Sequence, residues 1–259
     1  NACPNCLAHG SIAMHDECVH MGRVFVGIGA ILVTSSTLLP ANATSSAVET
    51  EIARSLKQLA ALRLTATAPI ADYDRDYFGT AWADVDENSC RTRDDILARD
   101  LTDVVKRDSC TVVSGKLADP YTGKALVFSK AKATAIQIDH VIPLSLAWDS
   151  GADAWSTGKR ATFANDPANL LAVDGPANQR KSDSGLAEWL PPNAKYQCTY
   201  VMRFVRVAFL YGVTITSDDR TTAKQVLKTC TVVKGHPATL TALSPDYWPH
   251  AAQYVHATP

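Results

Sequence analysis

Apolar residues spaced at helical intervals predict helices near both ends of the chain. One amphipathic helix is expected before Pro69, since five apolar residues recur on one face: Val48, Ile52, Leu56, Leu59 and Leu62. A later helix should close at Gly212, which can serve as its C-cap. The apolar face of that helix is formed by Val201, Phe204, Val205, Ala208 and Phe209. A further helix is expected over residues 218–229.

Short runs rich in β-branched and aromatic residues predict strands between these helices. Residues 111–113 and 124–128 are expected to pair through the turn-rich segment 119–123. Residues 135–138 and 170–173 predict two more strands. The pattern therefore favours an α+β fold.

Helical segments surround the second pair of strands. A mostly helical insertion is expected over residues 145–148 and 152–163, and Pro176 suits the first turn of a helix after the second strand. Upstream, Thr92 followed by Asp95 resembles a capping box that opens a helix. The predicted order around residues 135–185 is strand, insertion, strand, helix.

The first 43 residues have the pattern of a leader. A short basic start at Arg23 precedes an apolar run and an Ala-x-Ala end at Ala43, which predicts a signal peptide over residues 21–43 and a secreted protein. The alternative is an uncleaved anchor, but the run is shorter than the roughly 20 apolar residues that a span needs. Residues 1–20 are expected to be upstream translation or a non-native extension. The mature form should not contact a membrane.

Cysteine usage agrees with export. Three of the seven cysteines precede Ala43. An even number remains, which predicts two disulfides in an exported protein. These four cysteines can pair in three ways, and metal ligation or free thiols are the alternatives to disulfides. We prefer the pairing that is local in sequence, which joins Cys90 to Cys110 and Cys198 to Cys230.

Candidate chemistry begins at the end of the third predicted strand. Asp139 and His140 are adjacent there, and Asn178 lies in the first turns of the following helix. A carboxylate, an imidazole and an amide could supply a metal ligand, a general base and a second ligand, which phosphodiester hydrolysis requires. An isolated Asp-His pair is more often structural, but the downstream Asn169 and Lys181 favour the chemical interpretation.

His140 is also the only histidine between the leader and the stretch 234–259, which we expect to be a loose tail. Charge is less informative. The formal net charge is −1, and a nuclease needs only a locally basic groove. Tyr73, Arg75 and Phe78 are interpreted by default as packing residues, although they could support the site from its N-terminal side.

Four stretches carry a resemblance to a known family: IDHVIPLSLAWDSGADAW, KRATFANDPANLLAV, NQRKSD and EWLPPN. The chain resembles the HNH, or His-Me finger, endonucleases, and among them the branch related to the C-terminal domain of GmrSD-type restriction enzymes. A similar arrangement marks the HNH domain of RNA-guided CRISPR nucleases. The resemblance implies a ββα-metal core over about residues 135–185, within one nuclease domain spanning residues 47–233.

The resemblance also implies roles for single residues. Asp139 and Asn178 would bind one divalent ion, His140 would be the general base, and Asn169 would brace the loop or orient His140. Oxygen ligands favour Mg²⁺, with Mn²⁺ as a second possibility.

Lys181, Arg180 and Arg160 are candidate phosphate contacts, and solvated surface charge is the rival interpretation. The expected function is a secreted, metal-dependent endonuclease with low sequence specificity, acting on DNA or possibly RNA, with no stable protein partner. The alternative is a catalytically inactive domain that binds nucleic acid or a surface. A serine esterase or zinc protease is disfavoured, because neither Gly-x-Ser-x-Gly nor His-Glu-x-x-His occurs.

Overall fold

The computed structural model describes residues 41–65 and 72–230. The predicted extension 1–20, most of the predicted signal peptide and the predicted tail 234–259 lie outside the described residues. Within the described residues the fold is α+β, as expected. None of the described helices combines the length and apolar content that crossing a membrane requires.

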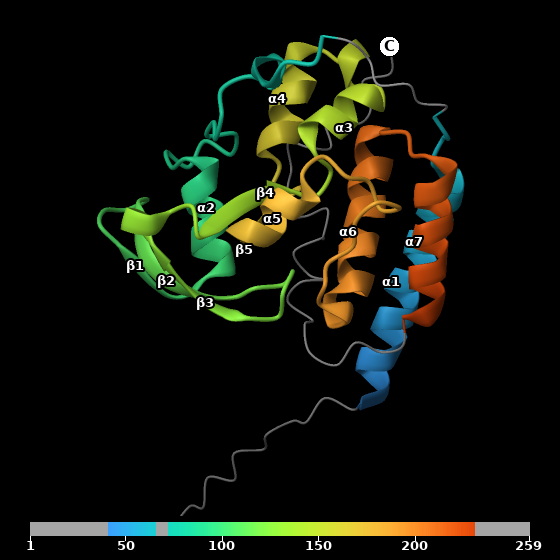
Figure 1. The fold of residues 1–259 in the computed structure, drawn as a ribbon, viewed down its shortest axis with the longest axis horizontal. Helices are drawn as coiled ribbons and strands as arrows, with labels where there is room; N and C mark the ends of the chain where they lie inside the picture. The colour runs from blue at the N-terminus through green and yellow to red at the C-terminus, as the bar shows by residue number, and fades with distance from the viewer. Residues whose placement is uncertain (1–40, 66–71, 231–259) are drawn as a thin grey trace, which may run out of the picture. The chain divides into compact units, whose positions relative to one another are not determined.

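Three long helices lie side by side, on the right of Figure 1: α1 (Ala41–Ala61), α6 (Ala194–Tyr211) and α7 (Ser217–Thr229). Helix α6 ends as predicted, because Gly212 adopts a left-handed φ of 73° and its amide donates to a carbonyl of the last turn. The predicted apolar face of α6 was one residue too wide, since Phe209 remains 43% exposed.

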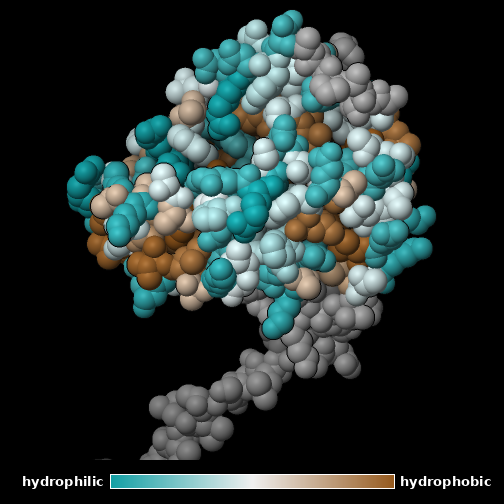
Figure 2. All heavy atoms as spheres, in the orientation of Figure 1, coloured by the Kyte–Doolittle hydropathy of each residue, from teal (hydrophilic) through white to brown (hydrophobic). Residues whose placement is uncertain are grey.

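A three-stranded antiparallel sheet contains β1 (Thr102–Lys106), β2 (Val112–Ala118) and β3 (Ala125–Ser129). The predicted pairing of β2 with β3 is confirmed. Strand β1 was not predicted, because it buries none of its residues and therefore lacks an alternating apolar pattern. Exposed Val105 and Val127 leave apolar side chains on this sheet, and hydrophobic residues are visible in that part of Figure 2.

A separate two-stranded antiparallel sheet pairs β4 (Ile136–His140) with β5 (Leu170–Asp174), and α5 (Gly175–Lys181) follows directly. The order strand, insertion, strand, helix is therefore present. In Figure 1 these elements lie between the three-stranded sheet and α6. The insertion between the two strands is helical: α3 (Leu144–Asp149), the 3-10 turn η3 (Ala152–Ala154) and α4 (Thr157–Asn165).

Helix α2 (Thr92–Asp100) starts differently from the prediction. Its N-cap is Arg91, which makes no side-chain cap, and the Thr92 hydroxyl instead donates to the carbonyl of Ala83. The predicted capping box is therefore wrong, because Thr92 lies inside the helix and its hydroxyl fixes the preceding loop.

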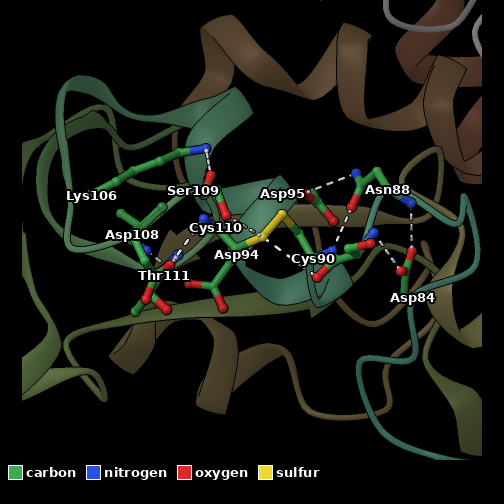
Figure 3. The surroundings of a disulfide bond; sticks show 12 residues. Asp84, Asn88, Cys90, Asp94, Asp95, Lys106, Asp108, Ser109, Cys110 and Thr111 are labelled. Carbon is green, nitrogen blue, oxygen red and sulfur yellow. Dashed lines mark hydrogen bonds between the residues drawn. A yellow bond between two sulfur atoms is a disulfide. The ribbon is translucent and has the colours of Figure 1, made fainter.

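Both predicted disulfides are present. Cys90–Cys110 joins the loop before α2 to the β1–β2 turn, and Cys198–Cys230 joins the start of α6 to the end of α7. Around the first disulfide, the Asn88 amide nitrogen donates to Asp95, and the backbone of Asn88 donates to Asp84 (Figure 3). Each disulfide should stabilise the fold by about 3 kcal/mol by restricting the unfolded chain.

Strand β4 separates two hydrophobic cores. Ile136 and Ile138 belong to the core shared with α2 and the three-stranded sheet. Val141 and the neighbouring Leu171 belong to the core that contains α6. Because successive side chains of a strand point to opposite faces, the adjacent residues Leu170 and Leu171 of the paired strand β5 belong to different cores.

The loop before β5 is held by two arginines. Arg203 from α6 donates to the carbonyls of Pro167, Ala168 and Leu170, and Arg99 from α2 donates to two of the same three carbonyls. These bonds supply donors to the carbonyls of a buried loop. They fix the segment that carries Asn169.

Candidate active site

Asp139 and His140 are neighbours in sequence but belong to opposite faces of β4. Asp139 pairs across the sheet with Leu171, and His140 pairs with Leu170, which are themselves in different cores. Both side chains are almost fully buried, with 6% and 8% exposure. The two groups therefore have separate surroundings.

Asp139 lies in a buried polar network. One carboxylate oxygen accepts from the ammonium of Lys181 at 3.0 Å, and the other accepts from the Tyr121 hydroxyl. The same ammonium donates to the His140 carbonyl at 2.8 Å. Lys181 is completely buried, so this contact joins the Asp139 side chain to the backbone of His140.

Burial and pairing act in opposite directions on this network. Removal from water raises the pKa of Asp139 and lowers the pKa of Lys181, because each charged form loses hydration. The ion pair opposes both changes, and the Tyr121 bond adds to it at Asp139. A buried pair of this kind depends on both partners, since either charge alone would be left uncompensated.

The surroundings of Asp139 do not fit a metal ion in this arrangement. Both of its oxygens already accept bonds, and the ammonium 3.0 Å from one of them would repel a cation there. The Asn178 amide nitrogen donates to Gln137, on the Asp139 side of β4. Among the described residues, no group of three or more His, Cys, Asp or Glu side chains could bind a metal.

His140 has a different environment. Its Nε2 lies 2.8 Å from the carbonyl oxygen of Ala164 in α4. A carbonyl only accepts, so we assign the proton to Nε2, which leaves the lone pair on Nδ1. The ring of Trp82 stacks on the imidazole, with centroids 6.1 Å apart. Burial lowers the pKa of His140 to about 3, and His140 is therefore neutral at physiological pH.

His140 lines a pocket between β4, α4 and the 3-10 turn η1 (Arg75–Phe78). Asp139 and Asn178 are not among its lining residues. Of the three residues expected to form one site, His140 alone lines this pocket. The polar and aromatic side chains that line the pocket with His140 include Arg75, Asp76, Trp82 and Asn165.

Asn165 leaves one polar atom of this pocket region without a partner. Its amide nitrogen donates to the Ala161 carbonyl at 2.9 Å, whereas its buried Oδ1 has no donor among the described residues. A buried acceptor left unpaired costs about 1–3 kcal/mol. Such atoms occur where a water or a ligand completes the site.

Asn169 braces the backbone after β4. Its Oδ1 accepts from the Ile142 amide at 2.8 Å, and its Nδ2 donates to the Ile142 carbonyl at 3.2 Å. The bracing that the sequence suggested for Asn169 is therefore present. The His140 ring is oriented instead by Ala164 and Trp82.

The three predicted phosphate contacts have different positions. Lys181 is fully buried. The Arg160 guanidinium donates to backbone carbonyls that include those of Tyr77 and Ala152. These contacts give Lys181 and Arg160 structural roles. Arg180 is exposed on α5 and remains available to solvent.

The comparisons with known proteins agree with the sequence resemblance. The family described as "GmrSD restriction endonucleases, C-terminal domain" matches residues 91–225. The chain belongs to this family. It is also 34% identical over 212 residues to a protein of Arthroderma benhamiae named "Uncharacterized secreted protein", covering 81% of this chain and all of that protein. No solved structure matches the chain.

The sequence did not predict the roles of three residues that lie near Asp139 or His140 in this GmrSD C-terminal domain. Tyr121 lies in a segment that we interpreted only as a turn, and nothing local linked it to Asp139. Arg75 was interpreted by default as a packing residue that could also support the site, and Trp82 was given no role. Both precede the residues that the family matches, so the family signature does not include them.

Proposed function

We propose that this chain is a secreted endonuclease that hydrolyses phosphodiester bonds of DNA or RNA with His140 as general base. The observation that carries the proposal is the Nε2 bond to the Ala164 carbonyl, which leaves a neutral imidazole with its Nδ1 lone pair available in a pocket. Membership of a restriction endonuclease family supports the class of reaction.

In this mechanism His140 Nδ1 removes a proton from a water molecule. The water oxygen bonds to phosphorus as the bond to the 3′-oxygen breaks. The departing 3′-oxygen takes a proton from solvent, which leaves a 5′-phosphate and a 3′-hydroxyl. A phosphate anion beside the ring would favour the imidazolium and raise the pKa of His140 toward the range in which a general base is most effective.

No step of this hydrolysis mechanism involves the predicted divalent ion. The contacts of Asp139 do not fit a cation, and the choice between Mg²⁺ and Mn²⁺ stays a prediction from the family resemblance. A direct test is to compare cleavage in EDTA with cleavage in added Mg²⁺ or Mn²⁺.

Secretion is part of the proposal. The apolar leader before Ala43, the two disulfides and the name of the fungal relative all favour an extracellular protein. Disulfides persist outside the cytosol, where thiols are not kept reduced. Mass spectrometry of the protein recovered from culture medium would locate the new N-terminus, which we expect after Ala43.

A second candidate is a domain that binds nucleic acid without cutting it. The ion pair between Lys181 and Asp139 favours this alternative, since it occupies the group that the family resemblance assigns to the metal. Substrate and product assays separate the two candidates, because the alternative predicts binding with no change in strand length.

The decisive experiment incubates the purified full chain with plasmid DNA, single-stranded DNA and RNA. Cleavage by the wild-type protein and its loss in His140→Ala are expected. His250→Ala is a matched control that removes an imidazole outside the described residues. Cleavage that persists in His140→Ala would reject His140 as the base.

A further inference from the structure

We propose that the guanidinium of Arg75 binds the scissile phosphodiester in the His140 pocket. This inference rests on the proposed function, which brings a phosphodiester beside His140. It assigns the phosphate contact to a residue that lies before the stretch matched by the family. The sequence had instead suggested Lys181, Arg180 and Arg160 for that role.

The backbone that carries Arg75 is fixed against the insertion. Turn η1 packs on α4, and in Figure 1 the teal segment leading into α2 passes beside that helix. Asp74 caps the turn by accepting from the Asp76 amide at 2.8 Å. The Tyr77 carbonyl accepts from Arg160 Nε at 2.9 Å, and Phe78 is buried. The start of the Arg75 side chain is thus held at the edge of the pocket.

The charge of Arg75 is available for a ligand. Its side chain is exposed, and within residues 41–65 and 72–230 it makes no hydrogen bond or ion pair. Lys181 and Arg160, in contrast, use their donors within the protein. A guanidinium can donate two parallel hydrogen bonds to phosphate oxygens, which is the geometry that this side chain favours.

Arg75 and His140 act on the same space. Both line the pocket, and the positive charge of Arg75 is one cause of the low pKa of His140. A phosphate held by Arg75 would therefore lie in the same pocket as the imidazole that activates water. Its negative charge would also offset the effect of the guanidinium on that imidazole.

Asp76 gives the proposal an internal check. It lines the same pocket, and a carboxylate there repels a phosphate. Replacing Asp76 by Asn should therefore tighten binding of a nucleic acid, whereas replacing Arg75 should weaken it. If the pocket binds an anion, these two neighbouring substitutions should change the binding affinity in opposite directions. Unfolding of turn η1 would instead weaken binding in both variants.

The test measures binding of a fluorescent single-stranded oligonucleotide to the full chain carrying His140→Ala, so that the ligand stays uncut. Arg75→Ala should weaken binding about 10- to 100-fold, as expected for loss of charge-assisted hydrogen bonds. The slope of log affinity against log salt should fall by about 0.7, the value for one phosphate contact on a single strand. Arg75→Lys should keep the slope and recover part of the affinity.

Arg107→Ala is the matched control, since it removes the same charge from an exposed side chain of the β1–β2 turn, outside the pocket. Its affinity and salt slope should stay close to those of the parent. Equal effects of Arg75→Ala and Arg107→Ala would overturn the proposal. Thermal melting of each variant confirms that the fold is retained, which the exposure of Arg75 leads us to expect.

A cleavage assay with native His140 separates this inference from the proposed function. If the wild-type protein cleaves, Arg75→Ala should lower kcat/KM about 10- to 100-fold. Binding that depends on Arg75 without any cleavage would retain the phosphate site and reject hydrolysis. Cleavage that does not change in Arg75→Ala would retain hydrolysis and reject the phosphate site. If the protein shows neither cleavage nor binding that depends on Arg75, both proposals are rejected.

Discussion

The two faces of β4 use neighbouring residues in opposite ways. On one face Asp139 is enclosed by Lys181 and Tyr121, and every polar atom of the carboxylate has a partner. On the other face His140 has one ring nitrogen bonded, while the other has no partner among the residues that the structure describes, and Arg75 lines the same pocket. The first face resembles a structural polar core, and the second resembles a site that receives a ligand.

Residues that are adjacent in a motif therefore need not have adjacent side chains. A strand turns successive side chains to opposite faces, so Asp139 and His140 can cooperate only through the backbone or through a third residue. Lys181 is that residue here, because its ammonium contacts the Asp139 carboxylate and the His140 carbonyl.

The largest expected effect follows from removing the base. We predict that His140→Ala lowers the rate of nucleic acid cleavage by about 10²- to 10⁴-fold, because general-base catalysis typically contributes that factor. Initial rates on a labelled oligonucleotide measure it, and circular dichroism checks the fold. If Asp139→Asn abolishes cleavage equally and leaves stability unchanged, the Asp139 face is catalytic and the contrast between the faces fails.

The next effect concerns the buried ion pair. We predict that Lys181→Met lowers the free energy of unfolding by about 3–5 kcal/mol, since the Asp139 carboxylate stays buried without its cation. Urea denaturation measures the change. The double variant Lys181→Met/Asp139→Asn is the control, and it should recover part of the loss because no charge remains uncompensated.

A different outcome would restore the role that the sequence suggested for Lys181. Native stability of Lys181→Met, combined with weaker oligonucleotide binding, would mean that the ammonium reaches substrate. That result would contradict the structural interpretation of the Asp139 face.

A smaller effect is expected from Tyr121→Phe, which removes one hydroxyl and keeps the ring. The Asp139 carboxylate loses one of its two donors, so the free energy of unfolding should fall by about 1.5–3 kcal/mol. Thermal and urea unfolding measure this change, and cleavage should be retained. A loss of cleavage at unchanged stability would place Tyr121 in the chemistry instead.

A more gradual effect, spread over several pH units, is a dependence of stability on pH that arises from His140. Its pKa is lowered from 6.5 to about 3 in the folded protein, so the unfolded chain binds more protons between these values. Stability should therefore fall as the pH drops below 6.5, by at most about 1.4 kcal/mol per pH unit from this group. In urea unfolding over this range, the free energy of unfolding should depend less steeply on pH in His140→Gln than in the wild-type protein. Equal pH dependence in the two proteins would contradict the low pKa of His140.

Much of the local structure was predictable because it depends on short-range patterns. The apolar spacing identified α1 and α6, and Gly212 ended α6 because glycine adopts a left-handed φ without strain. The even number of cysteines predicted two disulfides, and the preferred local pairing, one of three possible, is confirmed. Strand β1 escaped prediction because both of its faces are largely exposed.

The site was predictable in its residues but not in its geometry. The sequence by itself identified Asp139, His140 and Asn169 as unusual, and it determined the family. Only the tertiary structure decided that Lys181 is buried, because a lysine in a sequence normally predicts an exposed side chain. The Asp139 carboxylate offsets the cost of removing the Lys181 ammonium from water. Only the fold could bring Arg75 and His140 to the same pocket, because their positions depend on how η1 packs on α4 and not on any local pattern.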